Sequence, residues 1–283
     1  MYVVKTVKEA KEITRKWKSE GMTVGLVPTM GYLHDGHLSL IKRSVADNDK
    51  TCVSVFVNPI QFGKNEDFGS YPRDMEHDSA LCEQSGADLV FCPSAEEMYP
   101  EGFCSHIEIS GPAEGLCGAR RPGHFNGVCT VVMKLFNIMA PTHAYFGQKD
   151  AQQLAVIRRM VKDFNLDVEV CGMPIIREAD GLAMSSRNTY LSAGERKAAL
   201  CLSHALKEVK AQFESGERDA AKLKQSAQAV IAGEPLARID YIEIVDIISM
   251  KPIDRLAAPA LCALAVYIGR TRLIDNIALE VLK

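Results

Sequence analysis

The sequence predicts an α/β protein in which a parallel sheet with helices on both faces precedes a smaller α+β region. Short, almost continuously apolar segments alternate with amphipathic segments of helical period over the first 175 residues. After residue 174 the order changes to helices followed by consecutive strands. The length of 283 residues exceeds the usual size of a single domain and favours two.

The first part of the chain contains five predicted strands, each short and apolar, as expected for strands buried on both faces. They cover residues 23–27, 51–57, 88–92, 144–146 and 167–170. Amphipathic helices are expected around them, at residues 7–19, 37–46, 74–85, 128–140 and 150–164. This alternation indicates a Rossmann-like domain over residues 1–175. Such sheets bind ligands at the carboxyl ends of strands, where the strand order reverses.

The second part, residues 176–283, is predicted to form a smaller α+β domain. The expected helices cover 193–213 and 220–232, and the expected strands cover 239–245, 261–268 and 274–281. No Gly/Ser-rich or Pro-rich linker separates the two parts. We therefore expect a short hinge near residues 175–178 and a cleft between the domains.

The composition is that of an ordinary globular protein, with 47% hydrophobic and 24% charged residues. The net charge of −3 gives no general attraction to nucleic acid or membrane, so neither is an expected partner. The N-terminus lacks the apolar core of a secretion signal, and the longest apolar run, 256–268, is too short to span a bilayer. Nine scattered cysteines without a C-x-x-C pair indicate free thiols and a cytoplasmic protein.

The most informative motif is PTMGYLHDGH, from Pro28 to His37. It follows a predicted strand and leads into a predicted helix, so His34 and His37 lie where a strand passes into a helix N-terminus. Unpaired backbone N–H groups and the helix dipole attract anions there. Gly31 and Gly36 allow the backbone to approach a ligand closely. The motif suggests a triphosphate cradle in which both imidazoles face phosphate oxygens.

Two other interpretations of the histidine pair stay open. A His pair could bind a metal, but zinc sites on helices use i, i+4 spacing with a Glu between, and neither holds here. Either histidine could instead cap the helix. A metal role could also be imagined for Asp74, Glu76 and Asp78, but charged helix faces are usually only solvated. We therefore expect no metal ligands from the protein.

A second candidate binding segment, DGLAMSSRN, runs from Asp180 to Asn188 without strong periodicity. Ser185, Ser186 and Arg187 combine two hydroxyl groups with a guanidinium. A guanidinium binds phosphate oxygens in a bidentate way and keeps its charge. The alternative is a solvated turn that leads into a capped helix.

Five blocks in this order resemble the motifs of the pantoate–β-alanine ligase family, within the HxGH-type nucleotidyltransferase superfamily. They extend from residue 28 to residue 276, so the resemblance covers almost the whole chain. The blocks are PTMGYLHDGH (28–37), VNPIQF (57–62), YFGQKDAQQ (145–153), READGLAMSSRN (177–188) and IGRTRLIDN (268–276).

The resemblance implies an ATP-dependent ligase. The carboxylate of pantoate attacks the α-phosphate of ATP to give pantoyl adenylate and pyrophosphate, and the amine of β-alanine then displaces AMP to give pantothenate. The resemblance also implies Mg²⁺ with the nucleotide and a homodimer. Two alternatives are a related nucleotidyltransferase that adenylates a phosphorylated acceptor such as phosphopantetheine, and an inert binding protein of the same fold.

The resemblance assigns roles to residues of this sequence. The catalytic residues would stabilise charge on the phosphates: His34, His37, Lys149, Ser185, Ser186 and Arg187. His37 matches the position of a proton donor. ATP would also be contacted by Met30, Gly31, Gly147, Gln148, Asp150, Ile176 and Met184, including backbone amides of the Met30–Gly31 loop. Gln61 and Gln153 would hold pantoate and β-alanine. Their neutral amides argue against a phosphorylated acceptor, which would need further Lys or Arg.

Overall fold

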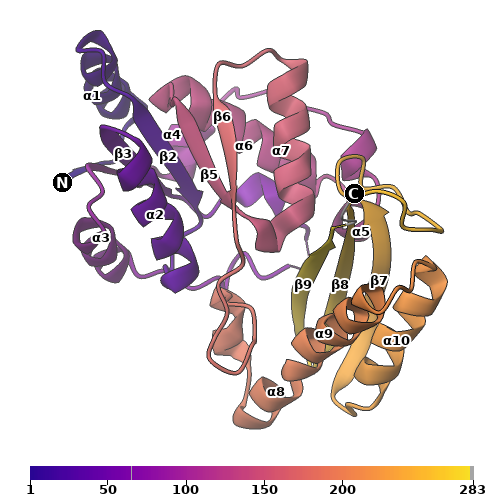
Figure 1. Ribbon diagram of the computed structural model, residues 1–283. Coiled ribbons are helices and arrows are strands. Elements are labelled where there is room, and N and C mark those ends of the chain that lie inside the picture. The colour runs from indigo at the N-terminus through magenta and orange to yellow at the C-terminus, as the bar shows by residue number, and fades with distance from the viewer. Residues whose placement is uncertain (65, 281–283) are drawn as a thin grey trace. The chain divides into compact units, whose positions relative to one another are not determined.

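The computed structural model describes residues 1–64 and 66–280 of the chain. The chain forms two compact units. Unit 1 comprises Met1–Ser110, Arg120–Gln148 and Val156–Pro174. Unit 2 comprises Gly111–Ala119, Lys149–Ala155 and Ile175–Lys283, of which residues 281–283 lie outside the described part. Figure 1 labels the elements of both units.

Unit 1 contains a six-stranded parallel sheet with the order β1-β4-β3-β2-β5-β6. The strands are β1 (Tyr2–Val4), β2 (Val24–Thr29), β3 (Lys50–Val55), β4 (Leu89–Phe91), β5 (His143–Gly147) and β6 (Glu169–Met173). From β2 the chain continues to β3 on one side of the sheet, and from β5 it continues to β6 on the other side (Figure 1). The predicted parallel α/β sheet is confirmed, and its order reverses between β2 and β5.

Two groups of helices flank this sheet. The helices are α1 (Val7–Ser19), α2 (Asp35–Asp47), α3 (Met75–Gln84), α4 (Ala95–Met98), α6 (His124–Met139) and α7 (Ala151–Asp163), whose first turn belongs to unit 2. α2 contacts α3, β2 and β5, while α1 and α6 contact each other and β2. Neighbouring residues of a strand point to opposite faces, and both Leu26 and Val27 of β2 are fully buried, so both faces are covered.

Several predicted limits differ from the observed ones. α2 begins at Asp35 rather than at residue 37, β3 ends at Val55 rather than at 57, and β6 begins two residues later than predicted. The pattern of the sequence did not predict β1, a three-residue edge strand that pairs with β4, or the short helix α4. Elements of this length carry too few residues for a periodic pattern, so tertiary contacts decide them.

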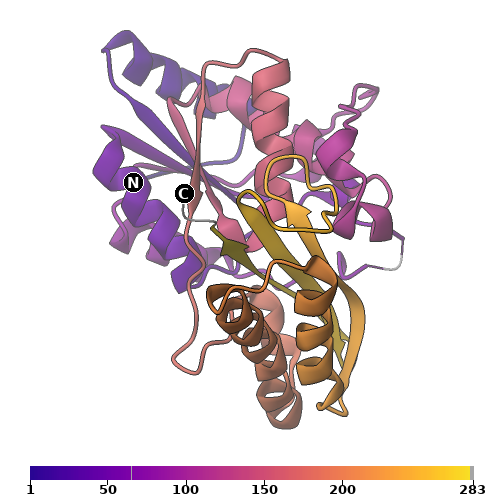
Figure 2. The same cartoon turned by 45° about the vertical axis from the view of Figure 1, so that its right-hand side comes forward.

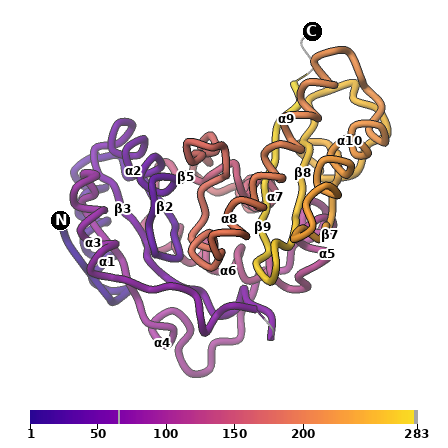
Figure 3. The backbone as a smooth tube through the Cα atoms, turned by 90° about the horizontal axis from the view of Figure 1, so that it is seen from below, coloured from indigo at the N-terminus to yellow at the C-terminus, as the bar shows by residue number. Residues whose placement is uncertain are grey.

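Unit 2 contains an antiparallel sheet of order β7-β8-β9. Its main elements are α8 (Ala193–Ala198), α9 (Leu200–Glu214), α10 (Ala220–Ala232), β7 (Ala237–Asp246), β8 (Ala260–Ile268) and β9 (Thr271–Leu279). α9 and α10 run side by side against the sheet (Figures 2 and 3), and Leu202, Leu206 and Leu223 lie in their shared core. The predicted α+β arrangement is confirmed, although the helix expected over 193–213 is interrupted at Ala199. The last residue of the predicted final strand, Val281, lies outside the described residues.

A buried glutamine explains why residues 111–119 group with unit 2. Gln152 of α7 is 6% exposed. Its Oε1 accepts the amide of Cys117, in the short helix α5 (Leu116–Arg120), at 2.9 Å. Its Nε2 donates to the carbonyls of Pro112 and Gly115 at 2.9 and 2.7 Å. The domain boundary between residues 175 and 176 stays a prediction, to which the structure adds that residues 111–119 and 149–155 pack with the C-terminal part.

All nine cysteines are free thiols, and six of them are buried. Burial raises the pKa of Cys82 to about 12, so this thiol stays protonated and unreactive. In the part of the chain that the structure describes, no helix has the length and apolar character needed to cross a bilayer.

Candidate active site

The turn that follows β2 has a strained backbone held by neighbouring side chains. Gly31 has φ +85° and Tyr32 has φ +52°, so two successive residues adopt the left-handed conformation. The hydroxyl of Thr29 accepts the Gly31 amide at 3.2 Å and donates to the carbonyl of Ser54 at 2.7 Å. A Cβ at position 31 would lie 2.9 Å from the carboxylate of Asp78, so both space and φ require glycine. The Gly31 amide, expected to face a phosphate, thus already has a partner within the turn.

Both histidines belong to the N-terminus of α2, where they form a reciprocal cap. His34 is the N-cap, and its Nδ1 accepts the amide of Gly36 at 3.1 Å. His37 is the third helical residue, and its Nδ1 accepts the amide of His34 at 3.3 Å. The ring centroids lie 4.1 Å apart. The helix-cap interpretation is therefore correct, and it sets the tautomer. Because Nδ1 accepts, the proton of each neutral ring lies on Nε2, which can donate to an anion.

Gln61 is held in a buried chain of polar side chains after β3. It ends the 3-10 turn Pro59–Gln61 and is 9% exposed. Its Oε1 accepts from Nδ2 of Asn58 at 3.0 Å, and its Nε2 donates to Sδ of Met30 at 3.1 Å. Tyr99 donates its hydroxyl to Oδ1 of Asn58 at 2.7 Å. Asn58 and Tyr99 therefore orient the Gln61 amide. Neither residue was predicted to belong to the site, because their contact joins positions 41 residues apart along the chain.

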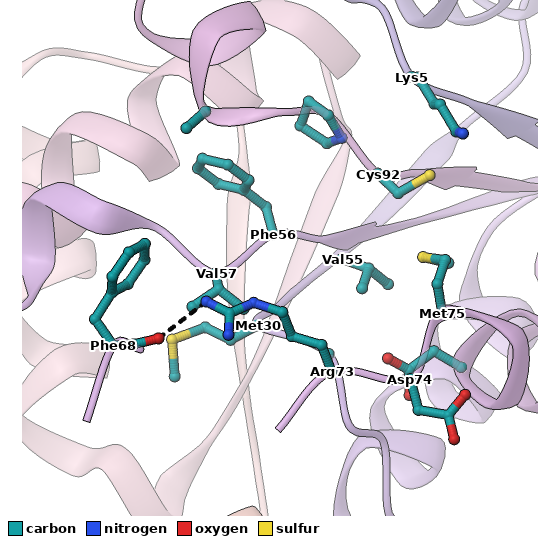
Figure 4. Close-up of a pocket in the computed structure, with 14 residues that line it drawn as sticks. Lys5, Met30, Val55, Phe56, Val57, Phe68, Arg73, Asp74, Met75 and Cys92 are labelled. Atoms are coloured by element: carbon teal, nitrogen blue, oxygen red, sulfur yellow. Dashed lines mark hydrogen bonds between the residues drawn. The ribbon is translucent and has the colours of Figure 1, made fainter. Parts of the chain in front are cut away.

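Met30 also lines a cavity of about 360 Å³ beside the carboxyl ends of β2 and β3. The wall around Met30 is mainly apolar and includes Val55 and Phe56 (Figure 4). Lys5 and Arg73 bring positive charge to the same lining, and Asp74 and Asp78 bring negative charge. A mainly apolar cavity of this size with a few polar groups suits a small ligand.

Lys149 lies in the 3-10 turn Gln148–Asp150, directly after β5. Its Nζ is 3.9 Å from Oδ2 of Asp150, and its side chain is 20% exposed. Its backbone carbonyl accepts Nδ2 of Asn276, from β9, at 2.8 Å. The main chain of the lysine is thus anchored while the ammonium group stays partly accessible. Gln153, one turn further along α7, is half-buried.

The segment before the Ser-Ser-Arg sequence is a hairpin. Arg177 pairs with Ala183 in an antiparallel bridge, and the chain turns at Gly181, which has φ +101°. The amide of Met184 donates to the carbonyl of Ile176 at 3.0 Å. Ile176 and Met184, both assigned to ATP, are therefore neighbours in this hairpin.

The Ser-Ser-Arg sequence itself is a capped turn. Ser185 precedes the 3-10 turn Ser186–Tyr190, and its Oγ accepts the amide of Arg187 at 3.3 Å. Ser186 is buried and Arg187 half-buried. The predicted turn into a capped helix is present, since Ser192 and Glu195 form a capping box at the start of α8, but the buried Ser186 shows that the turn is not simply solvated. The hydrogen bond at Ser185 uses a lone pair of its oxygen, so the hydroxyl hydrogen can still donate to a ligand.

Two consecutive polar residues of β9 form hydrogen bonds to the hairpin that contains Arg177 and to the 3-10 turn that contains Lys149. Asp275 is 2% exposed and accepts two hydrogen bonds from the guanidinium of Arg177, at 2.7 and 2.9 Å. Its neighbour Asn276 holds the Lys149 carbonyl. Asp275, Lys149 and Ser185 also line one small pocket. Asp275 and Asn276 belong to the fifth motif block but were not predicted to have a role, although a polar pair within an apolar strand was an available signal.

Replacing Arg177 by methionine is expected to destabilise the fold by about 3–5 kcal/mol, because it leaves the buried Asp275 carboxylate without its cation. Urea unfolding followed by circular dichroism measures the change. Arg270→Met, at an exposed arginine between β8 and β9, is the control and should shift stability by less than about 0.5 kcal/mol. Equal effects of the two substitutions would contradict the anchoring role of Arg177.

The predicted site residues fall into both units. Unit 1 contains Met30, Gly31, His34, His37, Gln61, Gly147 and Gln148. Unit 2 contains Lys149, Asp150, Gln153, Ile176, Met184, Ser185, Ser186 and Arg187. Within unit 1 the structure brings together the two histidines, and Met30 with Gln61. Within unit 2 it brings together Ile176 with Met184, and Lys149 with Ser185.

Comparisons with known proteins indicate one and the same family over almost the whole chain. The family model for pantoate-β-alanine ligase matches residues 2–278. A pantothenate synthetase of Heliobacterium modesticaldum is 57% identical over 281 residues, which cover 99% of this chain and 100% of the relative. A pantothenate synthetase of Clostridium botulinum strain Loch Maree is 56% identical over 276 residues, 98% of each chain.

Two solved structures are similar as well. The crystal structure of pantothenate synthetase from Thermus thermophilus has a TM-score of 0.95 and 45% identity, covering 99% of this chain and 100% of that one. A pantoate-β-alanine ligase from Francisella tularensis, complexed with β-γ ATP and β-alanine, has a TM-score of 0.82 and 33% identity over 100% and 99% of the chains. On these full-length matches, the chain belongs to the pantoate–β-alanine ligase family.

Proposed function

We infer that this chain catalyses the ATP-dependent condensation of pantoate with β-alanine. Pantoyl adenylate is the intermediate, and AMP and pyrophosphate are released. The observation that carries the conclusion is the histidine pair at the point where the parallel strand order reverses, in a chain that matches the family along its length. That point is where sheets of this type bind nucleotides.

We propose that the first step depends on fixed donors around the phosphates. The carboxylate of pantoate and the triphosphate are both anions, so charge must be neutralised as they meet. His34 and His37 would donate from Nε2, while Lys149 and Arg187 would supply positive charge. The hydroxyl groups of Ser185 and Ser186 would add two further donors to the same nucleotide.

The remaining contacts follow the family positions. ATP would also meet Met30, Gly31, Gly147, Gln148, Asp150, Ile176 and Met184. We propose that Mg²⁺ accompanies ATP through its phosphate oxygens, where it would withdraw negative charge. The side-chain amides of Gln61 and Gln153 would hold pantoate and β-alanine.

The geometry of Gln61 supports its role toward pantoate. Its Nε2 donates to the sulfur of Met30, which is a weak acceptor, so an oxygen of the substrate can replace that contact favourably. Its Oε1 is already oriented by Asn58. The apolar surface of Met30 would face the gem-dimethyl carbon of pantoate. Gln61 and Met30 offer only uncharged contacts, and the two cations of the cavity lining are matched by two carboxylates, which argues against a phosphorylated acceptor.

In the second step the amine of β-alanine attacks the acyl carbon of pantoyl adenylate. The bond from that carbon to the phosphate oxygen breaks, AMP leaves with the bonding electrons, and the amine loses a proton to become the amide of pantothenate. His37, with its proton on Nε2, can donate to a phosphate oxygen as charge develops. We also propose, from the family resemblance, that the protein is a cytoplasmic homodimer, and light scattering of the purified chain would test the dimer.

The reaction is tested by measuring AMP release with ATP, pantoate and β-alanine and then omitting each in turn. Release is expected only with all three. Exchange of labelled pyrophosphate into ATP is expected with pantoate alone, because the adenylate forms before β-alanine reacts. Exchange that required phosphopantetheine and ignored pantoate would replace this function by that of the related nucleotidyltransferase. ATP binding without either activity would indicate an inert binding protein.

A further inference from the structure

Asp78 is a buried carboxylate to which the proposed reaction gives no role. It lies in α3, four residues after the N-cap Asp74, and is 1% exposed. Its Oδ2 accepts the amide of Tyr32 at 2.8 Å, and its Oδ1 accepts the amide of Leu33 at 2.7 Å. Both oxygens of the carboxylate are thus bound to the main chain of the turn that precedes the two histidines.

Keeping this carboxylate ionised does not favour folding. Burial raises the pKa of Asp78 above its usual 3.8, and its amide hydrogen bonds offset only part of the effect. A raised pKa in the folded state means that the folded chain binds the proton more tightly than the unfolded chain. Protonated Asp78 therefore stabilises the folded chain below about pH 3.8, and this contribution is lost as the pH rises through the raised pKa. A charged group that lowers stability at neutral pH points to a functional reason for its presence.

The turn that Asp78 holds needs external support. Gly31 and Tyr32 have φ values of +85° and +52°, and a bulky residue such as tyrosine rarely adopts positive φ. Leu33, which follows, is buried in the core cluster that includes Leu40 of α2. The next residue is the N-cap His34. A change in the turn would therefore shift the start of α2 and redirect both imidazoles.

The helix α3, which carries Asp78, is itself fixed in place. Asp74 caps the helix by accepting the amide of His77 at 3.0 Å. Cys82, one turn after Asp78, is fully buried in the same core cluster as Leu33. Figure 4 shows Asp74 and Met30 at the cavity whose lining also includes Asp78. The carboxylate thus sits between a rigid helix and the turn, at the edge of the proposed substrate region.

We propose that Asp78 is a positioning residue for ATP, whose carboxylate fixes the turn at Tyr32 and Leu33 and so orients His34 and His37 before the triphosphate binds. The inference rests on the proposed contact of these histidines with ATP. Pre-orientation removes the cost of ordering the turn during binding. Its loss should therefore appear in ATP-dependent quantities and not in the stability of the fold.

Asp78→Asn tests the proposal. Asparagine has the same shape but one acceptor oxygen, and its NH₂ group would face the second main-chain N–H. ATP affinity measured by calorimetry is expected to fall about tenfold, the effect of losing one charge-assisted hydrogen bond. The thermal midpoint at pH 7 is expected to change little, because the removal of the buried charge offsets the repulsion between the NH₂ group and the second main-chain N–H. The KM for pantoate is expected to stay unchanged.

Glu83→Gln is the matched control, since it makes the same carboxylate-to-amide change on the same helix at an exposed position away from the cavity. ATP affinity should be unchanged in this variant. A second comparison uses a double mutant. In a His37→Asn background, Asp78→Asn should reduce kcat/KM for ATP less than it does in the unmodified chain, because Asp78 acts through the histidine turn.

Unchanged ATP affinity in Asp78→Asn would overturn the proposal, as would an equal loss in Glu83→Gln. A lowered thermal midpoint with fully additive effects in the double mutant would show a purely structural role and would also overturn it. Failure of the proposed reaction is a separate result. If the unmodified chain released no AMP with pantoate and β-alanine but Asp78→Asn still weakened ATP binding, the positioning role would stand without that reaction.

Discussion

Replacing His37 by asparagine is expected to lower kcat for AMP release by about 10²–10³-fold, the usual effect of removing one donor from a charged transition state. The Oδ1 of asparagine can replace Nδ1 as the acceptor of the His34 amide, so the helix cap is preserved. The donor at Nε2 is lost. Activity should therefore fall while the thermal midpoint changes little. Steady-state AMP release at saturating ATP and a thermal melt measure the two quantities.

His37→Gln keeps both functions in part. Glutamine at the third helical position can accept the His34 amide through Oε1, as in a capping box, while its NH₂ group remains as a neutral donor. This variant is expected to fold normally and to keep more activity than His37→Asn. The same pair of substitutions applies to His34, whose Nδ1 accepts the Gly36 amide. Normal turnover by His37→Asn would reduce His37 to a helix cap.

Lys149→Met is expected to lower kcat/KM for ATP by about 10²–10³-fold, because a fixed positive charge would be missing where pyrophosphate departs. The carboxylate of Asp150 is 3.9 Å from Nζ, at the limit of an ion pair, so it neutralises the lysine charge only weakly. Asn276 holds the backbone carbonyl of residue 149, a contact that does not depend on the side chain. Pyrophosphate exchange measures the loss, and the melting curve should stay unchanged.

Lys162→Met is the control for Lys149→Met, because Lys162 is an exposed lysine near the end of α7. Its exchange rate should equal that of the unmodified chain. Lys149→Arg keeps the charge but places it on a planar group of different reach, so its rate should lie between those of the other two. If Lys149→Met and Lys162→Met exchanged pyrophosphate at the same rate, Lys149 would have no role at the phosphates.

Much of the fold follows from local patterns in the sequence. Alternating apolar strands and amphipathic helices predicted the parallel sheet, since strand and helix periods depend only on neighbouring residues. The topology rule for such sheets then placed the loops after β2, β3 and β5 at one edge, and the observed order β3-β2-β5 confirms it. The motif blocks indicated the family, which the full-length matches confirm.

Only the tertiary structure decided which polar groups form hydrogen bonds within the protein. The imidazoles of His34 and His37 cap α2 through Nδ1, which assigns the proton to Nε2. Asp78 binds a turn 45 residues away, and Asp275 binds an arginine 98 residues away. The spacing of residues along a chain carries no information on such partners. A hydrogen bond depends on distance and direction between two atoms, and packing alone brings atoms from distant segments together.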